Sequence, residues 1–207
     1  MSFIRPSGSK SPPADVGLAL VLLASILGGC AQAGWVHPGY SERMPHSIAV
    51  LPVRNETVHQ LDAVSFGGFA QRMIIGAPTF DIPDLLRGSL EESLIQAGYE
   101  AARPAPGSVT AALESGKALP EDASAIPFDA ALHTAIEGWQ ADTGSVAGIR
   151  MRYRVELRSI PGAEVLFSGV FPCVHREDPR ARGTDEVPNA VRRSAKQALG
   201  ALPRRAP

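Results

Sequence analysis

The chain has little cysteine, few aromatic residues and almost no net charge. It contains two cysteines, Cys30 and Cys173, so at most one intramolecular disulfide is available. Aromatic residues make up 6% of the sequence, which argues against a sugar-binding groove lined with rings. A net charge of −1 gives no electrostatic case for nucleic-acid binding. The composition therefore gives no support for binding to polysaccharide or nucleic acid.

Long hydrophobic runs are also scarce. The one clear run, Val16–Leu27, is shorter than the roughly 20 apolar residues that a spanning helix needs. Arg5 and Lys10 precede it and the small pair Gly28-Gly29 follows it. A basic start, a short apolar core and small residues before a cut predict a secretory signal over residues 1–29. A transmembrane anchor and an ordinary secretory signal with an incidental cysteine are the alternatives.

The segment Leu27-Gly28-Gly29-Cys30 resembles the lipobox of bacterial lipoproteins. This resemblance implies cleavage before Cys30 and attachment of lipid, palmitate included, to its thiol. Several acyl chains would make the membrane attachment effectively permanent. Ala31 and Gln32 stand where an aspartate would favour inner-membrane retention, so the resemblance implies outer-membrane sorting. Removal of the leader changes the net charge from −1 to −2.

Acylation of Cys30 would leave Cys173 without a disulfide partner. A reactive nucleophile is one interpretation of such a thiol. Its neighbours Phe171, Pro172 and Val174 favour another, a buried thiol at the end of a strand.

Hydrophobic periodicity divides the mature chain into a tether over residues 30–46, a single domain over 47–202 and a tail over 203–207. The tether has glycine, proline and no periodicity. The domain patterns predict a buried strand over Ser47–Val53, a helix over Pro83–Ala97, a strand over Tyr99–Ala102, a helix over Val109–Glu114, a strand over Asp129–Gln140, a long antiparallel hairpin over Ile149–Val174 and a helix over Thr184–Leu202. The fold class is therefore an α/β (α+β) sandwich, a mixed sheet with a long hairpin packed by two main helices.

The sequence shows no assembled catalytic constellation. His133, Glu137 and Trp139 alternate onto one predicted strand face, but four residues on a strand span about 13 Å, too far for a dyad. No histidine pair has metal-ligand spacing with a carboxylate, so neither a metal nor another cofactor is predicted. A periplasmic hydrolase would need His59, Asp62 or His133 to meet in one pocket. We therefore predict a protein that is not an enzyme.

Two features are candidate partner-binding sites. Phe66 and Phe69 flank two glycines, as in an apolar loop that docks on a partner, although a loop folded over the core has the same composition. Arg150, Arg152 and Arg154 alternate onto one face of a strand, where they could meet carboxylates or phosphates. Alternatively, the row is salt-bridged to a neighbouring strand, for example through Glu137, or covered by a helix.

The run Ser47–Thr57 (SIAVLPVRNET) and the helix Leu85–Tyr99 (LLRGSLEESLIQAGY) resemble the CsgG and LpoB group of bacterial lipoproteins, and the later hairpin matches it in outline. The group resembles the TolB amino-terminal domain in fold. The resemblance covers most of residues 47–202 and implies accessory or assembly work in the cell envelope, with an envelope protein as partner and no catalytic residues. A lipoprotein that handles lipid or lipopolysaccharide through its arginines is the alternative.

Overall fold

The computed structural model describes residues 34–65, 79–119, 126–142, 148–176 and 186–204. They belong to one compact unit, Ala33–Pro207. Cys30, Phe66 and Phe69 lie outside the described residues, so the predictions that rest on them stay predictions.

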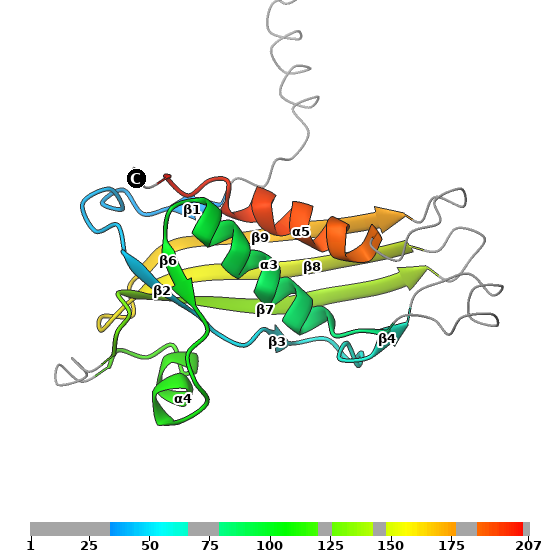
Figure 1. The fold of residues 1–207 in the computed structure, drawn as a ribbon, viewed down its shortest axis with the longest axis horizontal. Helices are drawn as coiled ribbons and strands as arrows, with labels where there is room; N and C mark the ends of the chain where they lie inside the picture. The colour runs from blue at the N-terminus through cyan, green and yellow to red at the C-terminus, as the bar shows by residue number, and fades with distance from the viewer. Residues whose placement is uncertain (1–33, 66–78, 120–125, 143–147, 177–185, 205–207) are drawn as a thin grey trace, which may run out of the picture. The chain divides into compact units, whose positions relative to one another are not determined.

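The domain is built on a seven-stranded mixed sheet whose order is β1-β9-β8-β7-β2-β6, with β3 paired to β7 (Figure 1). Strands β7, β8 and β9 form an antiparallel meander, whereas β2 runs parallel to both β7 and β6. The strands are β1 (Trp35–Val36), β2 (Ser47–Val50), β3 (Arg54–Asn55), β6 (Glu100–Ala102), β7 (Ala130–Asp142), β8 (Gly148–Ser159) and β9 (Val165–Arg176). A separate two-stranded sheet pairs β4 (Val64–Ser65) with β5 (Thr79–Phe80).

Three helices pack on the two faces of this sheet. Helices α3 (Ile82–Gln96) and α5 (Glu186–Leu199) contact each other on one face, and α4 (Ser108–Glu114) lies by the other (Figure 1). Parallel strands are joined by right-handed crossovers. Since β6 and β7 lie on opposite sides of β2, the crossovers through α3 and α4 must use opposite faces. Within the described residues, no helix has the length and hydropathy needed to span a bilayer.

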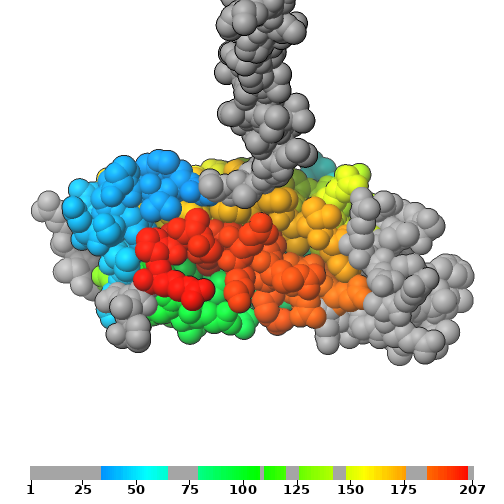
Figure 2. Space-filling view, turned by 90° about the horizontal axis from the view of Figure 1, so that it is seen from above, coloured from blue at the N-terminus to red at the C-terminus, as the bar shows by residue number. Residues whose placement is uncertain are grey.

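The face under α3 and α5, called the covered face below, holds the main core. Leu86, Leu90 and Leu94 of α3 are fully buried, as the spacing of the predicted helix required. In the space-filling view, the orange-to-red residues of α5 lie against green residues from earlier in the chain (Figure 2). The α/β sandwich predicted from the sequence is therefore the observed fold.

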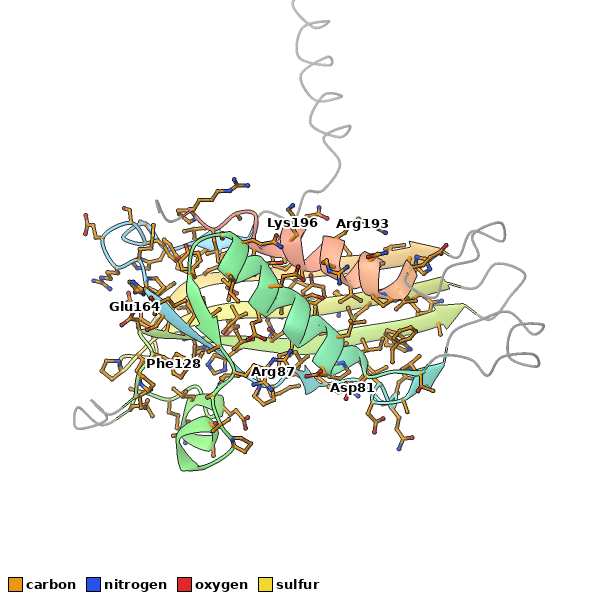
Figure 3. The ribbon with its side chains drawn as sticks, in the orientation of Figure 1. Asp81, Arg87, Phe128, Glu164, Arg193 and Lys196 are labelled. Carbon is orange, nitrogen blue, oxygen red and sulfur yellow. The ribbon has the colours of Figure 1, made fainter. Side chains whose placement is uncertain are left out.

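Side-chain caps fix the ends of these elements. Asp81 accepts a hydrogen bond from the Asp84 amide at 2.9 Å, which satisfies an exposed donor at the start of α3. Asp129 accepts from the amides of His46 and Ser47 at 2.7 and 2.9 Å, joining the starts of β7 and β2. Figure 3 places Glu164, by the β8–β9 turn, at one end of the sheet and Asp81 at the start of α3, part of the way along the sheet from it.

A strand and a buried tyrosine precede residue 47, where the first strand was expected. Trp35 pairs with Ser168 at the edge of the sheet, and Tyr40 is buried with its hydroxyl 2.9 Å from that of Tyr99. Arg43 is ion-paired with Glu164 near the hairpin turn. A two-residue strand has no hydrophobic period, which explains why the sequence pattern did not reveal it.

A β-bulge interrupts the alternation of β7 between Ile136 and Gly138. Beyond it Trp139 pairs with Met151 and packs against the main core, on the covered face. The prediction that Trp139 shares a face with His133 and Glu137 is therefore wrong. The extra residue of a bulge reverses the faces of every residue that follows it.

Candidate functional site

The face opposite α3 and α5, called the open face below, presents the predicted arginine row. On β8 the apolar residues Ile149, Met151 and Tyr153 are buried on the covered face. Arg150, Arg152 and Arg154 therefore lie on the open face, as strict alternation predicted. The structure places the three side chains in different surroundings, and these decide what each can do.

Arg154 is held by three carboxylates. Its Nε donates to Glu137 at 2.8 Å, its Nη1 to Glu156 at 3.1 Å and its Nη2 to Glu56 at 3.5 Å. Glu137 is the residue that the β7 bulge leaves out of the register with β8, and alternation from His133 and Ala135 places it on the open face. Burial alone would lower the pKa of Arg154, but these hydrogen bonds outweigh it and raise the pKa. Arg154 therefore ties β7, β8 and the turn after β3 together.

Glu156 extends this network to the next arginine. Arg158 donates to it from Nη2 at 2.6 Å, on the side away from Arg154. Burial would raise the pKa of Glu156, yet the hydrogen bonds from Arg158 and Arg154 lower it. The sequence pattern predicts Glu137 as a partner of the row but does not reveal Glu56. The Asn-Glu-Thr turn after β3 carries it, and only the pairing of β3 with β7 brings it close.

Arg152 and Arg150 are less engaged. Arg152 lies 3.7 Å from Glu137, which it shares with Arg154, and its side chain is 63% exposed. Arg150 is exposed, and no carboxylate of the described residues lies within salt-bridge distance of it. Of the three predicted arginines, these two are the ones with guanidinium groups available to a partner.

The other end of the open face is covered by α4. Leu113 of α4 packs there with Ala49, Leu51 and Ala131. His133 lies beside this cluster, 9% exposed, and borders a cavity of about 10 Å³ that Arg158 also lines. Burial, reinforced by the positive charge of Arg158, lowers the pKa of His133 to about 4. The imidazole is thus neutral at pH 7.

The structure does not bring the hydrolase candidates into one pocket. The His133 cavity includes neither His59 nor Asp62 in its lining. Asp62 is exposed. The backbone of His59 is bound to the side chains of Asn55 and Thr57, which organise a turn. Within the described ranges, no group of three or more residues is arranged to ligate a metal ion.

The second cysteine behaves as a core residue. Cys173 is 1% exposed, on the covered face within β9, and its burial raises the thiol pKa to about 11. The prediction of a buried thiol is confirmed. It lies inside the strand, where the meander pairs it with Met151, and not at the strand's end.

A second cavity, of about 210 Å³, opens between the ends of α3 and α5. Its lining includes Gln96, Lys196 and Arg204 beside Leu199 and Leu202. This mixture of cationic and apolar groups is open to solvent and differs from the apolar pocket that an acyl chain requires.

No protein-family model matches the chain, and no curated protein matches it in sequence. Solved structures do match. The PelC dodecamer from Paraburkholderia phytofirmans has a TM-score of 0.50 at 19% identity, over 77% of this chain and 89% of PelC. The hypothetical protein CT253 from Chlamydia trachomatis has a TM-score of 0.48 at 11% identity, over 75% and 94%. Lipoprotein GNA1162 from Neisseria meningitidis has a TM-score of 0.40 at 16% identity, over 70% and 94%.

At these identities the comparison with PelC concerns the fold alone. It supports the mixed sheet with helices that the chain itself shows, because nearly the whole PelC chain is covered. The TM-scores of the other two structures are too low to establish a shared fold.

Proposed function

We propose that this protein is a lipid-anchored, non-enzymatic accessory protein of the bacterial envelope, which presents its α/β domain to a periplasmic protein partner. Cys30 carries the lipid, and the protein is held at the outer membrane. The observation that carries the proposal is the lipobox-like Leu27–Cys30 segment at the end of a secretory leader. The resemblance to the CsgG and LpoB group supports the assembly or activation role.

The position of the first strand adds a geometric consequence. Only residues 31–34 separate Cys30 from β1, and an extended chain of that length spans about 18 Å at most. A lipid on Cys30 would therefore keep the β1–β9 edge of the sheet close to the membrane. Such tethering raises the effective concentration of a weak binding surface near a membrane partner.

The similar structure of PelC is a dodecamer. This supports self-assembly of the present chain as a part of the proposal, with an oligomer as the form that meets the partner. Phe66 and Phe69, together with the open-face arginines, remain the proposed contacts.

Lipid attachment is tested by growing cells that make the full chain with an alkyne-labelled palmitate. The wild type should carry label and sediment with outer membranes, and Cys30→Ala should lose both. Cys173→Ala is the matched control, since its thiol is buried, and should keep both. An unlabelled wild-type protein in the soluble periplasm would refute the anchor.

The partner is tested by cross-linking in intact cells, followed by purification of the labelled protein and mass spectrometry. We expect one envelope protein in constant ratio to the chain, and mass photometry of the extracted complex should show more than one copy. Recovery of the chain alone, as a monomer, would contradict the accessory role.

The alternative of a lipid-handling protein has one observation in its favour, the exposed guanidinium groups of Arg150 and Arg152. It predicts salt-sensitive binding of lipopolysaccharide that Arg152→Glu abolishes. The polar and cationic lining of the cavity between α3 and α5 gives no site for the acyl chains of such a ligand.

A further inference from the structure

The open face has three zones along β8. One end is covered by α4, and the centre is neutralised by the carboxylates around Arg154. The remaining end carries Arg150 and Arg152. Their cross-strand neighbours on β7 and β9 bear no charge, so the end is positive although the chain as a whole is slightly negative. We call this end the cationic patch; it consists of Gly138, Gln140, Arg150, Arg152, Pro172 and Val174.

The register of the sheet sets the shape of the patch. Gly138, Arg152 and Pro172 form one row across three strands. Gln140, Arg150 and Val174 form the next row. A side chain at Gly138 would meet the Arg152 side chain at 3.5 Å, so the glycine leaves that arginine uncovered. Val174 is 58% exposed, so an apolar side chain stands beside the two arginines.

We propose that the cationic patch docks an extended acidic segment of the protein partner. Two arginines at alternate positions of a strand stand about 7 Å apart, the spacing of carboxylates at positions i and i+2 of an extended chain. Arginine binds such carboxylates in bidentate geometry. An apolar side chain flanking the two acids would cover Val174 and Pro172. This inference rests on the proposed function, because it identifies the surface that the partner would contact.

The position of the patch favours a protein over the membrane as its occupant. Val174 is six residues along β9 from Ser168, the partner of Trp35, which is a distance of about 20 Å. The patch thus lies at the end of β9 remote from the edge that Cys30 would hold near lipid.

The test selects binding peptides from a random dodecapeptide phage library on the full, lipidated chain in detergent. The double variant Arg150→Glu/Arg152→Glu serves for counter-selection. The matched control is Arg193→Glu/Lys196→Glu, which reverses two exposed charges on α5, across the sheet (Figure 3). We expect enriched peptides with acids at i and i+2 beside an apolar residue. Their affinity should fall at least tenfold in the patch variant, weaken with salt and stay unchanged in the control.

Val174→Ser should weaken the same peptides without changing their salt dependence. The proposal is overturned if no peptide distinguishes the wild type from the patch variant, or if the enriched peptides lack paired acids. It is also overturned if vesicles of phosphatidylglycerol bind the patch in place of peptides, or if the patch variant loses self-assembly, which would make the occupant a second copy. Palmitate labelling and envelope cross-linking are read separately, so these failures leave the proposed function to its own tests.

Discussion

The two faces of the sheet use the same strands for opposite purposes. On the covered face, β8 buries an unbroken series of apolar side chains under α3 and α5. On the open face, the alternate residues of the same strand carry four arginines and a glutamate. Apolar packing under the two helices buries these side chains away from solvent. The open face shows a gradient, from a covered end through a neutralised centre to a cationic end, so charge alone does not identify its interaction site.

That gradient separates Arg154, which three carboxylates hold, from Arg150, which has no carboxylate within salt-bridge distance among the described residues. Arg154 and Arg150 are identical residues four positions apart on one strand face. Their roles differ because Glu137, Glu156 and Glu56 surround the first, whereas no carboxylate of the described residues lies within salt-bridge distance of the second. Substitutions on each face in turn, ranked by the loss of unfolding free energy, test this difference.

The largest loss should come from the covered face. Leu90→Ala removes a fully buried side chain of α3 and should lower the free energy of unfolding by about 2–5 kcal/mol, measured by urea denaturation. Ile95→Ala, on the same helix but 54% exposed, is the control and should change it by less than about 0.5 kcal/mol. Equal losses at the two positions would mean that α3 does not pack as described.

Acid should destabilise the protein through His133, which is buried at the α4 end of the open face. The pKa of His133 is lowered by burial from 6.5 to about 4 in the folded protein. Between those pH values the unfolded chain takes up a proton that the folded protein refuses, so stability falls as the pH falls from 6.5 toward 4. The loss should be on the order of 3 kcal/mol. We expect unfolding experiments across this range to show it.

His133→Gln should remove this part of the pH dependence and leave the loss of stability that follows when acid protonates Asp129 and Glu156. The pKa values of both carboxyls are lowered in the fold, through hydrogen bonds from the Ser47 and His46 amides and from Arg158 and Arg154, respectively. An NMR titration that placed the His133 pKa near 6.5 would show that α4 does not cover it.

Glycine positions provide a closer contrast between the faces. A methyl group at Gly169, on the covered face, would lie 2.5 Å from the Phe171 ring and 3.0 Å from the Gly34 backbone. Gly169→Ala should therefore destabilise the protein by about 1–3 kcal/mol in thermal unfolding. Gly138→Ala, on the open face, has only ordinary contacts and should be neutral or slightly stabilising. Similar effects of the two changes would argue against an open face at Gly138.

Much of this architecture could be predicted from the sequence, for reasons that particular elements make plain. The spacing of Leu86, Leu90 and Leu94 and the alternation of β8 are long periodic signals, and both were confirmed. Strand β1 was missed because it is two residues long and pairs with a strand distant in sequence, and the bulge at Glu137 was missed because it shows only in the register between β7 and β8. The same contrast between periodic patterns and tertiary pairing applies to the candidate site. Arg150, Arg152 and Arg154 were identified as a row, but ranking them required the carboxylates that tertiary structure brings to one member.

The smallest effects on stability should come from substitutions in the arginine row, and these test the difference between Arg154 and Arg150 most directly. Arg154→Met deprives the half-buried Glu137 and Glu156 of their shared partner and should cost about 1 kcal/mol of unfolding free energy, since solvent screens part of the network. Arg150→Met has no such partner to lose within the described residues and should change stability by less than about 0.5 kcal/mol. Raising the salt concentration should reduce the difference between the variants, because the network is electrostatic. If urea denaturation finds Arg150→Met as costly as Arg154→Met, then Arg150 is also engaged in the fold, and the cationic patch is not free to receive a partner.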